Sequence, residues 1–328
     1  MDELVALRGG KLPDRLRYLG FQPDDVTHVV RSARLALHDG EVTSALVAAV
    51  RDLESSVGGH FRGDPHLRSR ALTELDEWAS GSGRFTVGTL PVLALVAASD
   101  TVRGWHGGHG VDDDVTRATL ADLGRRVSLH RRSAGITGVD DATVLLPHWQ
   151  GSLYELGRLQ FELVRTPAGS RRRAALPEPL RDEPWLLRIR IPQMGPLSAR
   201  AVEDSLTAAR PFFAKHFGEG LEGYEPRFAL CTSWLLDPHF AAVLPENSHV
   251  VGFQRRFTTF GTPSPANEDA VYFAFGHRPG APLPGAEWLR REAEHCAEPG
   301  RALVQRVVAD RIATGESWHL VNGWLELP

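Results

Sequence analysis

The chain has 328 residues, of which 42% are hydrophobic and 24% are charged, and its net charge is -4. Its length favours two domains, and its hydrophobic share is enough to build a sizeable core. The composition excludes global disorder, and the slightly negative charge excludes the concentrated positive field of a nucleic-acid-binding protein. The two cysteines, Cys231 and Cys296, form no closely spaced pair, so we expect neither a disulfide framework nor a cysteine-based zinc site.

Neither the N-terminal segment nor the most apolar stretch indicates export or membrane insertion. The first sixteen residues, MDELVALRGGKLPDRL, contain no basic region followed by an apolar one, so we expect no signal peptide. The apolar stretch Thr86–Ala98 is too short to cross a bilayer and contains Pro91, which favours a buried helix or loop. We therefore expect a cytoplasmic protein with no membrane partner.

Helical periodicity dominates the first part of the chain. Leu46, Val50, Leu53 and Val57 recur at the spacing of one helix face. A later helix is expected to begin at the acidic residues 112–114 and to end in the basic residues 130–132, an order that suits the helix dipole. We expect a helical N-terminal domain over residues 1–140.

Strand-like alternation begins further along the chain, where apolar residues at 159, 161 and 163 and at 187, 189 and 191 alternate with polar ones. A short apolar run at 143–149 adds a third early strand, and a Pro-containing loop connects 166–184. Residues 141–328 are thus expected to form an α+β domain with a mixed, mainly antiparallel sheet. The remaining expected elements are helices at 199–217, 287–296 and 301–314, a short helix near 237–238, and strands at 227–235, 250–260, 271–276 and 318–327.

This order of elements matches the core of the GNAT fold from its second strand onward. The stretches LHRRSAGITGVDD, GSLYELGRLQFELV, IPQMGPLS, CTSWLLDPHFAAVLPENS, GFQRRF and WHLVNGWLEL resemble a bacterial family of acyltransferase-domain proteins. Members of that family combine a helical N-acyltransferase N-terminal domain with a GNAT-like C-terminal domain. The resemblance covers nearly the whole chain and implies an N-acyltransferase that moves an acyl group from acyl-CoA to an amine.

The resemblance also implies a cofactor site at the start of the 199–217 helix. GNAT enzymes hold the CoA diphosphate with the free amides of this helix end, where the positive end of the dipole lies. The matching residues here are Ile191, Gln193, Met194, Gly195, Leu197 and Ser198. The superfamily pattern is R/Q-x-x-G-x-G/A, whereas this chain reads QMGPLS, and Pro196 has no amide hydrogen to donate. The same residues also fit an ordinary loop followed by a Ser198 N-cap.

Acyl transfer needs a base for the amine and a proton donor for the departing thiolate. Glu162 is the candidate base because it lies on an alternating strand, although an ion pair with Arg188 or Arg190 across the sheet is the more common role of such a residue. Cys231 could donate a proton to the thiolate or carry the acyl group itself, and Tyr154 is a second candidate proton donor. Aromatic packing and a small buried residue are the alternative interpretations of these two.

We expect the acceptor, an amine-bearing small molecule or peptide, to bind between residues 157–164 and 185–191. Polar side chains on these strands and on the 227–235 strand would contact it, namely Arg158, Gln160, Arg190 and Ser233. The strand at 318–327 would either complete its own sheet or pair with a second subunit in a homodimer.

Two other functions fit parts of the sequence. A non-catalytic GNAT-fold protein that senses acyl-CoA would need the same fold and cofactor loop. A metal hydrolase would need His106 and His109, but their HxxH spacing lies in a glycine-rich segment and differs from the helical HExxH pattern, so we expect no metal. No Walker A motif, no GxGxxG after an expected strand and no GxSxG motif occurs, so kinase, dehydrogenase and α/β-hydrolase functions have no support in the sequence.

Overall fold

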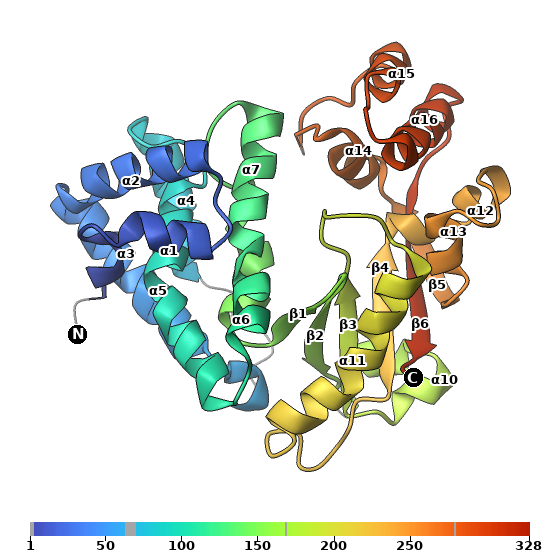
Figure 1. Ribbon diagram of the computed structural model, residues 1–328, viewed down its shortest axis with the longest axis horizontal. Coiled ribbons are helices and arrows are strands. Elements are labelled where there is room, and N and C mark those ends of the chain that lie inside the picture. The colour runs from blue at the N-terminus through green and yellow to red at the C-terminus, as the bar shows by residue number, and fades with distance from the viewer. Residues whose placement is uncertain (1–2, 63–69, 168, 279) are drawn as a thin grey trace. The chain divides into compact units, whose positions relative to one another are not determined.

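The computed structural model describes residues 3–62, 70–167, 169–278 and 280–328, and the chain forms two compact units (Figure 1). The first unit comprises Met1–Glu155, Glu162–Arg165 and His216–Gly223. The second comprises Leu156–Phe161, Thr166–Lys215 and Tyr224–Pro328. The first unit is mainly helical and the second carries most of a six-stranded sheet, which confirms the expected fold class.

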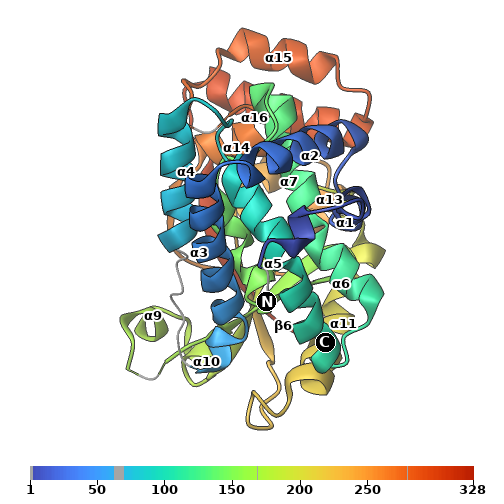
Figure 2. The same ribbon diagram turned by 90° about the vertical axis from the view of Figure 1, so that its left-hand side faces the viewer.

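The helices of the first unit pack around α5, whose sequence Thr89–Gly108 contains the most apolar stretch of the chain. Residues Thr89–Ser99 of α5 are all buried, as expected for that stretch. Figure 2 shows α3 and α4 beside α5. The other helical elements here are η1 (Val5–Leu7), α1 (Leu12–Tyr18), α2 (Pro23–Leu37), α3 (Gly40–Ser56), η2 (Gly59–Arg62), α4 (Arg70–Ser82), α6 (Asp113–Leu120), α7 (Asp122–Ala134), η3 (Ala142–Leu145) and α8 (Leu146–Trp149).

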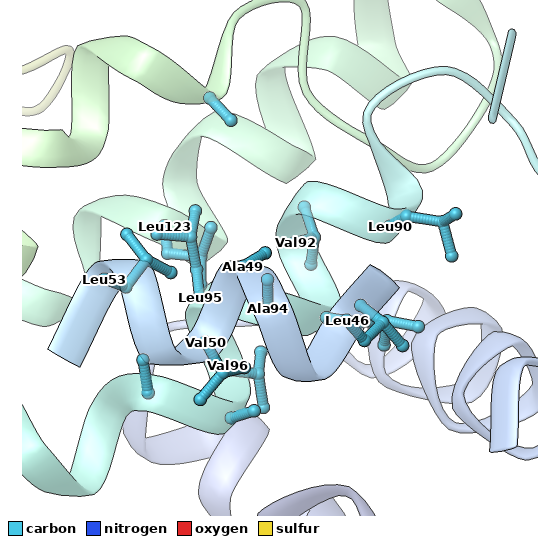
Figure 3. Packing of buried hydrophobic residues seen from close by; sticks show 14 of the residues in the cluster. Leu46, Ala49, Val50, Leu53, Leu90, Val92, Ala94, Leu95, Val96 and Leu123 are labelled. Carbon is cyan, nitrogen blue, oxygen red and sulfur yellow. The ribbon is translucent and has the colours of Figure 1, made fainter. Parts of the chain in front are cut away.

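The helix spacing predicted from the sequence places the α3 side chains against α5. Leu46, Val50 and Leu53 point from α3 toward the apolar side chains of α5 (Figure 3). The fully buried Trp149 of α8 also joins this core and donates its indole N–H to the Leu95 carbonyl at 2.8 Å. Apolar burial of this kind contributes about 25 cal/mol per Å², so this cluster is the main source of stability in the first unit.

The expected helix over 112–132 is interrupted at Ala121, which separates α6 from α7. Gly124, in the first turn of α7, lies against the turn that follows α1. A side chain at this position would come within 2.1 Å of the Gly20 carbonyl carbon, and the Gly124 amide donates to the Leu19 carbonyl at 3.0 Å. The close approach of two backbones therefore fixes the path of α7.

The sheet has the order β1-β2-β3-β4-β6-β5. Its strands are β1 (Leu153–Leu156), β2 (Leu159–Arg165), β3 (Trp185–Arg190), β4 (Phe228–Ser233), β5 (Thr258–Pro265) and β6 (His319–Glu326). Strands β3 and β4 are parallel, whereas β6 runs antiparallel to both β4 and β5. Because β6 lies between two strands of its own chain, both of its edges are paired, and it completes its own sheet rather than pairing with a second subunit.

Helix α11 (Ala199–Phe217) has the bounds predicted from its apolar stripe, and it lies across one face of the sheet (Figure 1). The opposite face is covered in part by Leu176 and Leu180, which pack against Leu186 and Phe228. The other helical elements after β2 are α9 (Arg171–Ala174), α10 (Glu178–Arg181), η4 (Trp234–Leu236), α12 (His239–Val243), α13 (His249–Gln254), α14 (Asn267–Phe275), α15 (Ala286–Glu294) and α16 (Pro299–Ala313).

Two expected strands in the second half are wrong. Residues 250–254 belong to α13, whose start is capped by the Ser248 hydroxyl accepting from the Val251 amide at 3.3 Å, and strand β5 begins at Thr258. Residues 271–275 belong to α14, where Ala270, Val271 and Ala274 share a buried helical face. These segments pack around the buried Trp318 on the helical side of the unit.

The expected early strand at 143–149 is also wrong, since these residues form η3 and α8. Asp141 caps the segment by accepting from the Thr143 amide at 2.8 Å, and Pro147 occupies the first turn of α8. The first strand instead follows Gly151. Across the described residues, no helix is both long enough and apolar enough to pass through a bilayer.

Candidate functional site

The candidate site lies in the second unit, where the loop after β3 leads into α11. The parallel ladder of β3 and β4 pairs Leu187 with Ala229, Arg188 with Leu230 and Ile189 with Cys231, and no later pair follows in the described residues. Each strand continues past the last pair, to Arg190 and to Ser233. The carboxyl ends of parallel strands are a preferred place for ligand binding, and the loop after β3 leaves the sheet at that end.

Arg158 fixes the loop that follows β3. Its guanidinium donates to three main-chain carbonyls of that loop, at 3.2 Å to Pro192, 3.1 Å to Gly195 and 3.1 Å to Pro196. A further bond from the Met194 amide to the Pro192 carbonyl at 2.8 Å tightens the turn. A planar guanidinium with five donors suits such a multiple contact. Arg158 was predicted to contact substrate, but here it holds the shape of the loop.

The turn between β1 and β2 positions Arg158. The Ser205 hydroxyl of α11 accepts from the amides of Arg158 at 2.8 Å and Leu159 at 3.3 Å, and donates to the Ala201 carbonyl at 2.9 Å. Gly157 has a φ of +75°, and a side chain there would come within 3.1 Å of the Ser205 hydroxyl. The turn, the helix and the loop are therefore joined by one hydrogen-bonded arrangement.

The backbone amides at the start of α11 are unoccupied, as the cofactor hypothesis requires. In the described part of the chain, no acceptor bonds the amides of Gly195, Leu197, Ser198, Ala199 or Arg200. The Ser198 hydroxyl accepts weakly from the Ala201 amide at 3.4 Å, which makes Ser198 the N-cap. The carbonyls of Pro192, Gly195 and Pro196 are turned toward Arg158, so they do not repel an anion at the amides. Because α11 also contributes the positive end of its dipole, this helix start can bind an anion such as a diphosphate.

The remaining predicted cofactor contacts divide into two groups. Ile191 is half-buried and Leu197 is buried, so their side chains anchor the two ends of the loop in the protein. Met194 is exposed at the tip of the loop. The Gln193 side chain donates to the Phe273 carbonyl of α14 at 2.8 Å, so it ties the loop to the protein and does not point freely toward a ligand.

Two predicted catalytic side chains are buried. Cys231 lies in the sheet interior, where desolvation raises the pKa of its thiol to about 12. Tyr154 donates its hydroxyl to the Gly151 carbonyl at 2.9 Å and packs against Phe217, and burial raises its pKa above the usual value of 10. Neither group is placed to exchange a proton with a ligand, so burial argues against both as catalysts.

Of the residues predicted on β2, Gln160 is buried and Glu162 is half-buried. Arg190, at the end of β3, is also half-buried. Ser233 accepts from the Leu235 amide at 3.1 Å and caps η4, so its hydroxyl already has a structural role. Glu162 thus stays the accessible carboxylate among the predicted catalytic residues.

The sheet register shows two polar residues that the sequence did not identify. Thr232 of β4 pairs with Asn322 of β6, and the Thr232 hydroxyl donates to the Asn322 side-chain oxygen at 2.7 Å. Both lie on the sheet face that carries Leu230 and Trp324, opposite in direction to Cys231. Thr232 is exposed, so this pair can contact a ligand at the carboxyl end of β4. Alternation along β4 is compatible with either face being exposed, and no pattern in the sequence showed that the face of Thr232 is the exposed one.

The histidine pair considered for a metal has other partners. His106 lies in α5, contrary to the expected loop, and its Nδ1 contacts the Thr116 hydroxyl at 3.1 Å. Burial lowers the pKa of His106 to about 3. His109 contacts the Trp105 carbonyl at 2.9 Å. Within the described ranges, no group of three or more His, Cys, Asp or Glu side chains is arranged to hold a metal.

Arg255 and Arg256, predicted to lie in a strand, follow α13 in a turn instead. Arg255 pairs with Glu246 at 3.4 Å, and Arg256 pairs with Glu203 of α11 at 2.5 Å. The second pair connects α13 to the first turns of α11 beside the candidate site.

Comparison with known domain families divides the chain into the same two types of domain. An N-acyltransferase N-terminal domain matches residues 10–151, and a GNAT-like C-terminal domain matches residues 153–325. The second match alone spans more than half of the chain. No protein of curated function matches the sequence.

Several crystal structures of acyltransferases are similar to the whole chain. A complex with decanoyl-CoA has 26% sequence identity and a TM-score of 0.75, and a complex with decanoyl-CoA and teicoplanin has 26% identity and a TM-score of 0.74. A mutant acyltransferase in complex with octanoyl-CoA has 27% identity and a TM-score of 0.74. Each match covers 98% of this chain and 89% of the other.

Proposed function

Because the chain belongs to the family that joins an N-acyltransferase N-terminal domain to a GNAT-like C-terminal domain, and is an acyl-CoA-dependent N-acyltransferase, we propose that its acceptor is an amine-bearing glycopeptide. The similar acyltransferase that was crystallised with decanoyl-CoA and teicoplanin supports this choice of acceptor and a medium-chain donor.

The observation that carries the proposal is the set of free amides at the start of α11. We assign the CoA diphosphate to the amides of Gly195 and residues 197–200, with the loop held in place by Arg158. Pro196 has no amide hydrogen to donate to a ligand, but its carbonyl accepts from Arg158. The residue that departs from the superfamily pattern therefore helps to hold the loop in place. The pantetheine arm would then run past the carboxyl ends of β3 and β4.

The reaction is a transfer of the acyl group from sulfur to nitrogen. The neutral amine attacks the thioester carbonyl carbon, the carbon–sulfur bond breaks, and the CoA thiolate leaves and takes a proton from water. Glu162 is the proposed acceptor of the proton that the attacking amine loses, because it is a half-buried carboxylate on β2. The exposed Thr232 and its partner Asn322 contact the acceptor on the sheet face.

Decanoyl-CoA and deacylated teicoplanin provide a direct test. We expect CoA to raise the melting temperature of the protein, and release of free thiol to require both the acyl-CoA and the amine. Stabilisation by CoA without thiol release across a panel of amine glycopeptides would favour the acyl-CoA sensor instead.

The role of Glu162 is tested separately with Glu162→Gln. We expect kcat to fall about a hundredfold or more, with the Kd for CoA unchanged, because a general base contributes roughly 10²–10⁴ in rate. Glu219→Gln, at an exposed residue beyond the end of α11, is the matched control. If Glu162→Gln retains the acidic limb of the wild-type pH–rate profile, another group is the base.

A further inference from the structure

His319, the first residue of β6, and Asp237, which follows η4, form a histidine–carboxylate pair in the second unit. The His319 Nδ1 contacts the Asp237 carboxylate at 3.2 Å, and the Asp237 side chain is only 2% exposed. A carboxylate beside Nδ1 keeps a proton on that nitrogen. Among the described residues no protein group bonds the Nε2 of His319, and this atom is accessible to solvent. The ring is thus oriented by a buried acid and leaves one nitrogen open.

The Asp237 carboxylate is held by three further donors. They are the backbone amides of His239 and His319, at 2.9 and 3.0 Å, and the Arg311 guanidinium at 2.8 Å. Glu316, 3.7 Å from Arg311, and the imidazole of His239 are further titratable groups beside the pair. When His319 is protonated, it and Arg311 balance the two carboxylates of Asp237 and Glu316. Asp237 therefore has a fixed position from which it orients the ring.

The pair lies at the carboxyl end of β4. Strand β6 is antiparallel to β4, and Ser233, the last residue of β4, is opposite Val321. His319 comes two residues earlier on β6, so it lies about 7 Å beyond this pair and on the same sheet face as Ser233. Gly323 lets the chain after β4 fold onto that face, since a Cβ there would come within 2.9 Å of the Leu236 side chain. The loop before α11 leaves β3 at the same end, because β3 and β4 are parallel.

We propose that His319 supplies the proton that reaches the departing CoA thiolate, with Asp237 as its positioning residue. This inference rests on the proposed function, in which the pantetheine arm runs past the carboxyl ends of β3 and β4. The protonated Nε2 gives its proton to a water molecule, which protonates the sulfur as the carbon–sulfur bond breaks. His319 is left neutral and regains a proton from solvent, while the proton lost by the amine goes to Glu162.

His319→Asn is the test, because the asparagine amide nitrogen takes the place of Nδ1 beside Asp237 while the side chain has no titratable proton. His295→Asn, at an exposed residue that follows α15 in the same unit, is the matched control. Two donors are compared with deacylated teicoplanin as the acceptor. They are decanoyl-CoA and S-decanoyl-thiophenol, whose aryl thiolate leaves without needing a proton. Rates are measured between about pH 5 and pH 9, and urea denaturation checks that each variant is folded.

We expect His319→Asn to lower kcat with decanoyl-CoA about tenfold or more at neutral pH, and to keep kcat with S-decanoyl-thiophenol within about twofold of wild type. The wild-type rate with decanoyl-CoA should decline on the alkaline side, where the proton donor is deprotonated. His319→Asn should lose this alkaline limb and keep the acidic limb assigned to Glu162. His295→Asn should match wild type with both donors.

An equal fall in kcat with both donors would show that His319 only supports the structure, and would overturn the proposal. An unchanged kcat with decanoyl-CoA would also overturn it. If wild type does not accept the thiophenol ester, the pH profile decides, and an alkaline limb retained by His319→Asn overturns the assignment. A wild-type protein that binds CoA but acylates no amine glycopeptide would instead overturn the proposed function.

Discussion

The guanidinium of Arg158 donates to the Gly195 carbonyl at 3.1 Å, joining two residues that are 37 positions apart in the sequence. Arg158 sits in the turn between β1 and β2, and Gly195 sits at the tip of the loop before α11. Because the same guanidinium also holds the Pro192 and Pro196 carbonyls, the loop is fixed before any ligand arrives. A preorganised anion site loses less entropy on binding than a mobile one.

Replacing Arg158 by Met should therefore weaken CoA binding without removing any atom that touches the cofactor. Three hydrogen bonds to a charged group are lost, and we expect the Kd for CoA to rise about tenfold or more. Isothermal titration with CoA measures the effect. Arg290→Met, which breaks the exposed pair between Arg290 and Asp310 in the same unit, should leave the Kd unchanged. An unaltered Kd for Arg158→Met would mean that the loop keeps its shape unaided.

Ser205→Ala tests the second connection in this arrangement. The Ser205 hydroxyl satisfies the amides of Arg158 and Leu159 while it donates to α11, and it is buried. Leaving buried amides without an acceptor costs about 1–3 kcal/mol in the free energy of unfolding. Urea denaturation measures this loss, with Thr207→Ala at an exposed position of the same helix as the comparison. A loss no larger than that of Thr207→Ala would show that water replaces the hydroxyl.

The sequence predicted the elements whose apolar pattern has one interpretation. The stripe of Val202, Leu206, Ala209 and Phe213 fixed both ends of α11, and strict alternation identified β2 and β3. The pattern failed at 250–260, where Val250, Val251 and Phe253 fit a strand or a buried helix equally well. The Ser248 cap and the core around Trp318 decide for the helix, and both depend on tertiary structure.

For the candidate site, too, the sequence indicated local features and missed those that depend on tertiary contacts. The resemblance to GNAT enzymes pointed to the loop before α11, and the unbonded amides there follow from secondary structure alone, because every helix start has them. The role of Arg158 depends on a contact across many residues, which no local pattern contains. Similarly, the sequence pointed to Cys231 and Ser233 on β4, whereas the exposed polar residue of that strand is Thr232. Alternation along a strand gives two possible faces, and only the pairing of Thr232 with Asn322 shows which one is exposed.

His106 makes the acid stability of the first unit testable. Its folded-state pKa is about 3 because it is buried, whereas the unfolded value is 6.5. Below pH 6.5 the unfolded chain binds a proton that the folded protein does not. The free energy of unfolding therefore decreases as the pH is lowered from about 6.5 to about 3. At pH 5 the loss amounts to about 2 kcal/mol. The lowered pKa of Asp122 acts in the same direction, but only below its ordinary value of 3.8.

We expect His106→Gln to flatten the dependence of the unfolding free energy on pH between 4.5 and 7, although its stability at pH 7 will be lower. Urea denaturation at several pH values provides the comparison, with His38→Gln at an exposed position of the same unit as control. If the slope of His106→Gln equals that of wild type, another group binds the proton on unfolding.

Cys231 distinguishes direct transfer from a covalent acyl-enzyme. Its thiol is 1% exposed, and desolvation raises its pKa to about 12. At pH 8 roughly one such thiol in ten thousand is ionised, and the thiolate is the nucleophilic form. Iodoacetamide should therefore label the partly exposed Cys296 in the native protein and reach Cys231 only after denaturation, as mass spectrometry of the digested protein can measure.

Cys231→Ala should keep kcat/KM for decanoyl-CoA within about twofold of wild type, and lose ~1 kcal/mol of stability from the smaller buried side chain. Cys296→Ala, with the buried thiol intact, serves as control and should be equally active. In the proposed direct transfer no acyl-cysteine forms, so no labelled acyl group should remain on the protein without acceptor. A folded Cys231→Ala protein with a hundredfold lower kcat, together with acyl label on the wild-type thiol, would require a two-step transfer instead.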